Sequence, residues 1–317
     1  MPYTAYISHP DCLLHDPGRH HPERPGRLHA VRNALLDEGL LEGLCLLDAP
    51  PATDAQLQRV HTAAHVAHIR ASTPASGHQA LLDPDTIMGE HTLQAALRAA
   101  GAGIEGVRAV MEGDADNAFC AVRPPGHHAE RARAMGFCLF NNVAVAAAHA
   151  LEHYALSRVA IADFDVHHGN GTEDIFRDDP RVLYCSSFQH PYYPDTPHAE
   201  RDHLIHTPLA ARTAGAGFRA ALERDWIPAM DRFMPELVLV SAGFDAHRDD
   251  PLASLNLDED DFAWVTRALA AVASRHAGGR LVSMLEGGYD LPALGLSAAA
   301  HVRVLCCAPE RQTSGRP

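Results

Sequence analysis

Short apolar segments alternate along this chain with longer segments of helical periodicity, and this alternation restricts the possible folds more than any other feature. The apolar segments are typical of buried strands, and they span residues 4–8, 118–122, 159–165, 182–186, 237–241 and 281–285. The helical segments between them span residues 24–38, 92–111, 141–153, 217–233 and 258–276. Such an order favours an α/β fold with a parallel sheet and helices on both of its faces.

The chain carries no sign of a second domain. It has 317 residues, and no Gly/Ser-rich or Pro-rich linker or internal repeat divides them. We expect one domain over residues 1–307, followed by a frayed tail over residues 308–317.

Charge and hydropathy exclude several classes of protein. The formal net charge of −14 would repel a phosphate backbone, so we expect no nucleic-acid partner. No apolar run approaches the roughly 20 residues of a membrane span, and the N-terminus lacks the features of a signal peptide. The seven cysteines form no CxxC pair and therefore indicate neither a disulfide framework nor a thiolate zinc site. We expect a cytoplasmic protein without membrane contact.

Polar motifs follow four of the predicted strands. They are RPPGHHAE from residue 123, DFDVHHGNGT from residue 163, AGFDAHRDDP from residue 242 and EGGYD from residue 286. In an open parallel sheet, ligands bind beyond the carboxyl ends of the strands. The sequence therefore predicts a functional site where these motifs meet.

The DFD and FDAH motifs offer ligands for a metal ion. Asp163, Asp165 and His167 share one face of an extended segment, because side chains alternate along it with a period of two. Asp165 and His167 can bind one cation, and Asp245 is the best candidate for a third ligand. One imidazole and two carboxylates leave a position open for water, which suits catalytic Zn²⁺ and also Fe²⁺ or Mn²⁺. Alone, the D-x-H pattern would more often be a turn or cap.

Two adjacent histidines and one tyrosine could perform acid/base chemistry beside this metal. His127 and His128 need polar partners, and Asp163 and Asn170 are available. A carboxylate raises the pKa of a histidine whereas an amide only orients it, so the two imidazoles could differ in protonation. A neutral Tyr289 could donate a hydrogen bond to a carbonyl oxygen that gains negative charge. Taken singly, a His–His pair is also typical of surface loops, and a tyrosine in this position is also typical of the end of a strand.

These motifs together resemble the histone deacetylase superfamily of metal-dependent amidohydrolases, closest in style to its class II and bacterial deacetylase-like members. The matching segments are RPPGHHA, GFCLFNNVAVAA, DFDVHHGNGT, SAGFDAHRDDPLASLNL and LEGGYD. The resemblance extends from HPERPGRL near the N-terminus to EGGYDL and covers nearly the whole chain. It implies the single-domain arginase/deacetylase fold, with an eight-stranded parallel sheet and helices on both faces.

The resemblance also implies a role for each matching residue. The zinc-ligand positions, for one zinc ion per chain, hold Asp165, His167 and Asp245. The tandem histidines, their two partners and the catalytic tyrosine fall on His127, His128, Asp163, Asn170 and Tyr289. The substrate tunnel would be lined by Gly136, Phe137, Tyr193 and Leu252. A monovalent-cation site of the family, for a structural K⁺, would use Asp163, Asp165, His167 and Ser186.

The implied reaction is zinc-dependent removal of an acetyl-type acyl group from the ε-amine of lysine. A metal-activated water attacks, His128 acts as general base and then as general acid, His127 is a charged partner, and Tyr289 stabilises the oxyanion. The main alternative is deacetylation of an acetylpolyamine or another small acylated amine. Leu252 stands where polyamine-selective members carry an acidic residue, which favours lysine. The oligomeric state is left open.

Two further alternatives and one departure from the family pattern remain. An arginase-type ureohydrolase would need aspartates for a second metal at positions that hold His247 and Gly169. A non-catalytic acyl-lysine reader would be favoured by loss of Tyr289 or of a metal ligand, and none is lost. The departure follows Tyr193, where DTPHAERDHLIHTPL lacks the usual Gly-rich turn and has His206 in place of Asn.

Overall fold

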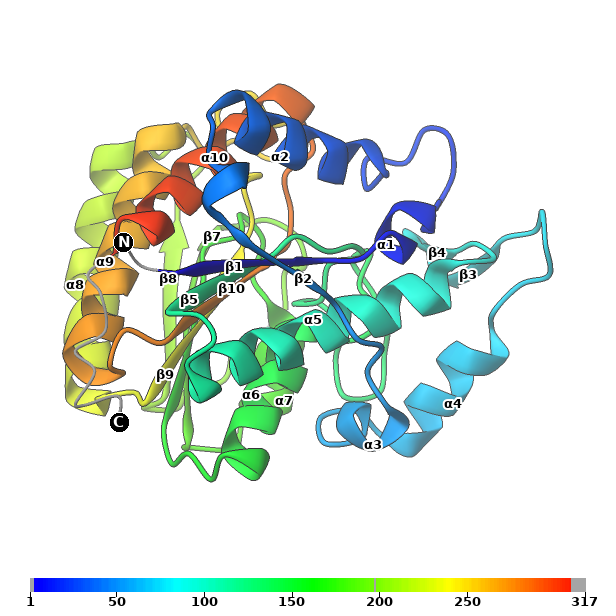
Figure 1. Cartoon of the computed structure of the whole chain (residues 1–317), viewed down its shortest axis with the longest axis horizontal. Helices are drawn as coiled ribbons and strands as arrows, with labels where there is room; N and C mark the ends of the chain where they lie inside the picture. Colours follow the sequence, from blue (N-terminus) through cyan, green and yellow to red (C-terminus); the bar gives the residue numbers. More distant parts are fainter. Residues whose placement is uncertain (1–2, 197, 309–317) are drawn as a thin grey trace.

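The computed structural model describes residues 3–196 and 198–308, and a single parallel sheet runs through its centre (Figure 1). The eight strands lie in the order β2-β1-β5-β10-β9-β6-β7-β8. Their bounds are β1 Thr4–Ser8, β2 Cys45–Asp48, β5 Asn117–Cys120, β6 Val159–Asp163, β7 Val182–Gln189, β8 Leu204–Leu209, β9 Leu237–Ala242 and β10 Leu281–Leu285. The predicted α/β fold with an eight-stranded parallel sheet is confirmed.

Helices cover both faces of this sheet. Helices α2, α8, α9 and α10 pack on one face, and α5, α6 and α7 pack on the other (Figure 1). Their bounds are α2 Gly26–Asp37, α5 Thr92–Glu112, α6 Asn142–His153, α7 Asn170–Phe176, α8 Gly215–Phe233, α9 Glu259–His276 and α10 Leu291–Cys306. The six inner strands between the two layers are buried on both sides, as their apolar sequences require.

Short elements complete the N-terminal third of the chain. They are α1 Asp11–Leu14, the 3-10 helix η1 Leu41–Gly43, α3 Asp54–Leu57 and α4 Ala63–Ala71. A separate antiparallel hairpin joins β3 Ala80–Asp83 to β4 Thr86–Met88. Within the described residues, no helix has both the length and the apolar character that a membrane span requires. Of the predicted tail, the structure describes Ala308, two residues beyond the end of the last helix, and residues 309–317 lie outside the described part.

The six strands that the sequence predicts are all present, and the two missing from that prediction are the edges of the sheet. Strand β2 is only half-buried on alternate residues, so it lacks the continuous apolar run of a central strand. Strand β8 contains Pro208, which cannot donate a ladder hydrogen bond and is tolerated at an edge. The predicted strand 159–165 ends at Asp163, which leaves Phe164 and Asp165 outside the ladder.

One helix cap ties a helix directly to a polar strand-end motif. The Asn141 side chain accepts a hydrogen bond from Ala144 N at the start of α6 (3.0 Å). Its amide nitrogen donates to the Ala129 carbonyl (3.2 Å) and to Thr172 Oγ1 (3.1 Å). The beginning of α6 therefore fixes the loop after β5 against α7, where two of the polar motifs lie.

Candidate active site

Four adjacent strands bring the predicted site residues to one edge of the sheet. Strands β5, β10, β9 and β6 are neighbours, and each ends in one of the polar motifs. Asp163 is the last residue of β6, Asp245 follows β9, and Tyr289 follows β10. Because parallel strands end at the same edge, residues more than 100 positions apart in the chain converge there.

Asp165, His167 and Asp245 form a buried cluster that suits a metal ion. Their ligand atoms all lie within 4.8 Å of one another. His167 Nδ1 is 3.1 Å from Asp165 Oδ1 and 3.3 Å from Asp245 Oδ2. Backbone amides hold the carboxylates in place: Val166 N donates to Asp245 Oδ1 (2.9 Å) and Gly287 N donates to Asp165 Oδ2 (2.8 Å).

The donor set passes a simple test of fit for a divalent cation. No described residue donates a well-directed hydrogen bond to Asp245 Oδ2, although this oxygen is fully buried. His167 Nδ1 lies 3.3 Å from this oxygen but does not form a hydrogen bond with it. A buried carboxylate oxygen without a hydrogen bond is costly, and a cation would satisfy it. A Cβ atom at position 287 would lie 2.0 Å from the same oxygen, so the glycine leaves that space open. Two carboxylates and one imidazole suit a catalytic cation with a free coordination position.

The imidazole of this cluster, His167, has a strongly shifted pKa. Burial opposes charge on His167, but the carboxylates of Asp165 and Asp245 outweigh it and raise the pKa to about 10. A bound cation therefore has to displace a proton from this ring, so metal affinity rises with pH.

The tandem histidines have different partners. His127 Nδ1 lies 3.0 Å from Asp163 Oδ2, which also accepts a hydrogen bond from the Tyr184 hydroxyl (2.9 Å). His128 Nδ1 lies 2.8 Å from Asn170 Oδ1. The Asn170 amide nitrogen donates to Glu130 (2.8 Å), which assigns its oxygen to His128.

Burial and the nearby charged groups separate the pKa values of the two rings. Burial lowers the pKa of His127, but Asp165 and Asp163 outweigh it and raise this pKa well above its ordinary value. Burial and the neighbouring His127 and His167 lower the pKa of His128 well below its ordinary value. At neutral pH the pair therefore holds one charged and one neutral imidazole, and His128 keeps Nε2 as a proton acceptor.

Tyr289 is positioned by contacts to its backbone and its ring. Its amide N donates to Asp250 Oδ2 (2.6 Å), and the Arg27 guanidinium carbon lies 4.9 Å from its ring centroid. Arg27 also donates through Nε to the Gly288 carbonyl (2.6 Å) and through Nη2 to that of Glu286. Burial raises the pKa of Tyr289 well above its ordinary value, so the phenol stays neutral and can donate a hydrogen bond.

A cavity of about 190 Å³ opens above these groups. The four residues expected to line a substrate tunnel all line it: Gly136, Phe137, Tyr193 and Leu252. The Phe137 ring lies 5.8 Å from that of Tyr289, and the Tyr193 ring lies 5.2 Å from that of His128, both edge to face. A Cβ at Gly136 would meet His128 Cδ2 at 2.4 Å, so only glycine allows this approach. Phe137, Tyr193 and Tyr289 give the cavity aromatic walls, and the imidazoles of His127, His128 and His167 also line it.

The residues expected to hold K⁺ lie on neighbouring elements. Ser186 in β7 is directly opposite Asp163 in β6. Its hydroxyl is 3.0 Å from Nδ1 of His168, the residue after His167. The K⁺ site itself stays a prediction.

Several residues that shape the site were missing from the sequence prediction. Asp85, in the β3–β4 turn, lines the cavity together with Pro125 and Tyr192. The Glu286 carboxylate accepts hydrogen bonds from Gly126 N (2.6 Å) and His127 N (3.2 Å), and burial raises its pKa to about 7.

A buried ion-pair network behind Tyr289 was also missing. Glu23 pairs with Arg27 (3.1 Å) and with Arg123, and all three side chains are inaccessible to solvent. These residues lie in the segments HPERPGRL and RPPGHHA. The charged residues inside these motifs were the only sequence signal for the network. That their charges are buried is visible only in the structure.

Comparison with known proteins agrees with the geometry. A family profile described as the histone deacetylase domain matches residues 21–305. The chain is 37% identical to the histone deacetylase-like amidohydrolase of Pseudomonas aeruginosa, over 90% of this chain and 82% of that protein. It is also 37% identical to the human polyamine deacetylase HDAC10, over 98% of this chain and 49% of that protein. The crystal structure of the HDA15 HD domain superposes with a TM-score of 0.91 at 33% identity, over 98% of this chain and 92% of that one.

Proposed function

The chain belongs to the histone deacetylase family of amidohydrolases, and from that premise we propose that it removes acetyl-type groups from the ε-amine of lysine in peptides or proteins. The observation that carries the proposal is the cavity of about 190 Å³, which is lined by His167 of the candidate metal cluster, by the tandem histidines and by Tyr289. A cavity of this size with aromatic walls suits the uncharged methylene chain of an acylated lysine.

We propose Zn²⁺ as the catalytic metal, held by Asp165, His167 and Asp245. When bound there, it would supply Lewis-acid polarisation of the acyl carbonyl and lower the pKa of a water molecule. The donor set supports this assignment, and so does Asp245 Oδ2, a buried oxygen that accepts no hydrogen bond from the described residues. Whichever cation binds, the backbone bonds from Val166 and Gly287 keep both carboxylates in the ligating orientation.

Three side chains move or hold protons in the proposed reaction. Neutral His128 takes a proton from the attacking water and returns it to the amine nitrogen as the amide bond breaks. Its orientation comes from Asn170 at Nδ1. His127, charged beside Asp163, stabilises the negative charge of the transition state, and the Tyr289 hydroxyl donates a hydrogen bond to the former carbonyl oxygen. The products are a free amine and a carboxylate.

The cavity mouth favours a peptide substrate. Leu252 presents no carboxylate there, and its carbonyl accepts a hydrogen bond from the Tyr192 hydroxyl (2.6 Å). Half-buried Asp85 is an acceptor that could bind a backbone N–H of a bound peptide. A small acylated amine such as an acetylpolyamine is the second candidate, because the same carboxylate could pair with its ammonium group and a polyamine deacetylase is among the similar proteins.

A side-by-side comparison of kcat/KM tests the substrate class. We expect kcat/KM to be higher for acetyl-lysine peptides than for N-acetylputrescine and acetylspermidine at one fixed ionic strength. The reason is that an ammonium group inside the aromatic cavity loses its hydration. A tenfold advantage of an acetylpolyamine, about 1.4 kcal/mol of transition-state preference, would reject the lysine assignment. The Asp85→Asn variant further separates the two substrate classes. Loss of this charge should lower kcat/KM more for an acetylpolyamine than for an acetyl-lysine peptide.

Two finer assignments complete the proposal. K⁺ would serve as a structural ion at Asp163, Asp165, His167 and Ser186, of which Asp163 and Ser186 are paired across β6 and β7. A cytoplasmic location is supported by the seven cysteines, all within the described residues and all unpaired, since a reducing compartment keeps thiols in this state.

A further inference from the structure

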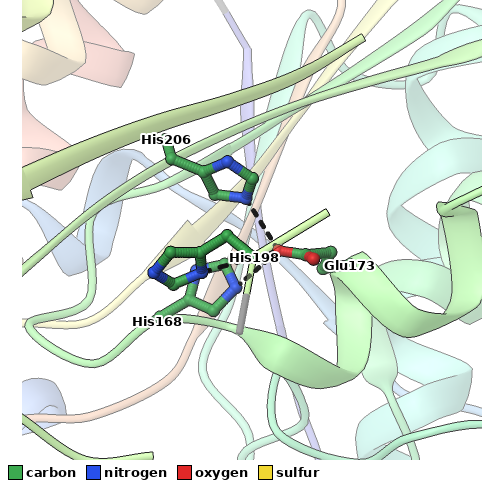
Figure 2. A group of neighbouring side chains, drawn as sticks. All are labelled: His168, Glu173, His198 and His206. Atoms are coloured by element: carbon green, nitrogen blue, oxygen red, sulfur yellow. Dashed lines mark hydrogen bonds and ion pairs between the residues drawn. The ribbon is translucent and has the colours of Figure 1, made fainter. Parts of the chain in front are cut away.

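A second group of metal-ligating side chains lies outside the catalytic cluster. Its members are His168 after β6, Glu173 in α7, His198 in the loop between β7 and β8, and His206 in β8. Figure 2 shows the three imidazoles gathered around the Glu173 carboxylate. His168 and Glu173 are buried, His206 is half-buried and His198 is exposed, so the group reaches the surface on one side. We call it the histidine–glutamate cluster.

The distances in this cluster are close to those of a metal centre. Glu173 Oε2 lies 2.8 Å from His168 Nε2, 2.7 Å from His206 Nε2 and 4.0 Å from His198 Nδ1. One ligand atom from each of the four residues lies within 4.8 Å of the others. Tetrahedral Zn²⁺ with bonds of about 2.0 Å requires ligand atoms about 3.3 Å apart. Shifts of less than about 1 Å would therefore complete the coordination.

Contacts around the cluster already orient the ligand atoms. The Ser186 hydroxyl lies 3.0 Å from His168 Nδ1, which directs Nε2 of the same ring into the cluster. Ala199 N donates to Glu173 Oε1 (2.7 Å), which leaves Oε2 to face the imidazoles. Hydrogen bonds of this kind, from the outside of each ligand, hold metal sites in shape.

A hydrogen-bond network alone explains only part of this arrangement. His168 and His206 each reach Oε2, but His198 stands 4.0 Å from it and stacks on His206 at 4.7 Å between ring centroids. Phe188 packs against both His168 and His198 at 4.8 and 4.9 Å. Two imidazoles would satisfy the carboxylate, whereas a cation uses all three.

We propose that the histidine–glutamate cluster binds a second zinc ion, with a structural role. Three imidazoles and one carboxylate fill a tetrahedral shell and leave no position open for water, unlike the catalytic cluster. The ion would join α7 to the edge strand β8 and to the β7–β8 loop. That loop also carries Tyr193, which lines the catalytic cavity, so the second ion would hold one wall of that cavity.

Two of the four proposed ligands come from the segment that departs from the family pattern. His198 and His206 both lie in DTPHAERDHLIHTPL, where the family usually has a Gly-rich turn and an Asn at the position of His206. The segment without that turn therefore supplies two of the four side chains of the cluster. A metal ion offers another means of fixing the loop. From the sequence we expect one zinc ion per chain, and this cluster raises the number of zinc ions to two.

The test is the zinc content of tag-free protein after dialysis, measured by elemental analysis. We expect about two zinc ions per wild-type chain, and one in Asp245→Asn, which loses the catalytic site. The His206→Asn variant should also hold one, while the double variant holds none. His190→Asn is a matched control, because this exposed residue lies 6.2 Å from the His198 ring but outside the cluster, and it should hold two.

Cobalt gives a second measurement that does not depend on activity. Titration of Asp245→Asn with Co²⁺ should produce the visible bands of a tetrahedral ion, and His206→Asn or His198→Ala in that background should abolish them. His198 is exposed, so its substitution keeps the test valid if His206→Asn does not fold. One zinc per wild-type chain, or bands and zinc unchanged by either histidine substitution, would overturn the proposal.

Discussion

The missing side chain at Gly287 leaves room beside the ligand oxygens of the catalytic cluster. A Cβ there would lie 2.0 Å from Asp245 Oδ2 and 2.6 Å from Asp165 Oδ2. We therefore expect Gly287→Ala to abolish zinc binding at this cluster and activity with it, because the carboxylates must move apart. Elemental analysis and a deacetylation assay check this outcome.

Gly43→Ala is the matched control for this substitution. No atom lies within 4 Å of a Cβ built at that position, so metal content and activity should be retained. Full activity in Gly287→Ala would mean that the cluster does not hold the catalytic metal.

Tyr289 allows a test of transition-state stabilisation without disturbing the metal. Its ring packs beneath Arg27 and its backbone is held by Asp250, so Tyr289→Phe should stay folded and keep its metal. We expect kcat to fall by about 10²–10³-fold, the usual cost of removing one oxyanion donor. Steady-state kinetics with an acetyl-lysine peptide measure the effect. Tyr154→Phe, which removes a hydroxyl bonded to Glu112 outside the cavity, serves as the control, and near wild-type kcat in Tyr289→Phe would refute the role.

At the scale of elements, a buried histidine joins α10 to its neighbours. His301 Nδ1 lies 2.6 Å from Thr266 Oγ1 in α9, and its Nε2 lies 2.9 Å from Ser283 Oγ in β10. The Thr266 hydroxyl donates to the Phe262 carbonyl, so the neutral ring satisfies all of these groups. Burial lowers the pKa of His301 to about 3.

This contact predicts a pH dependence of stability. An unfolded histidine binds a proton below about pH 6.5, whereas folded His301 does not until about pH 3, so the free energy of unfolding falls as pH drops through this window. Between pH 7.5 and 5.5 we expect the wild type to lose about 1 kcal/mol more than His301→Gln, measured by denaturant unfolding. Exposed His29→Gln should behave like the wild type. Equal losses in the wild type and His301→Gln would contradict the prediction.

At the scale of the whole molecule, the net charge of −14 creates a field that acts on substrates before they bind. We expect kcat/KM for an acetyl-lysine peptide with flanking arginines to fall as ionic strength rises, because salt screens the attraction. An uncharged acetyl-lysine peptide is the control and should respond little. The measurement is kcat/KM for both peptides at several ionic strengths with constant K⁺, and equal salt responses would exclude steering.

The sequence by itself determined the layered fold and the composition of the catalytic cluster. Central strands are buried on both faces and therefore carry continuous apolar runs, and their ends were visible as polar motifs. The edge strands β2 and β8 carry no such run, because one side of each has no neighbouring strand. Their existence came only from the resemblance, which implied eight strands.

Only the tertiary structure decided how the polar side chains are paired. The pKa values of His127 and His128 separate because burial and nearby charges act through space, and no spacing in the chain shows that Glu286 supports their loop or that Arg27 lies beneath Tyr289. The histidine–glutamate cluster is the clearest case. The sequence marked His206 as a departure from a family pattern, but His168 and Glu173 become its neighbours only when β8 pairs with β7 and α7 packs beside them. Local preferences select helices and strands from nearby residues, whereas a site requires distances between residues that the chain brings together only when it folds.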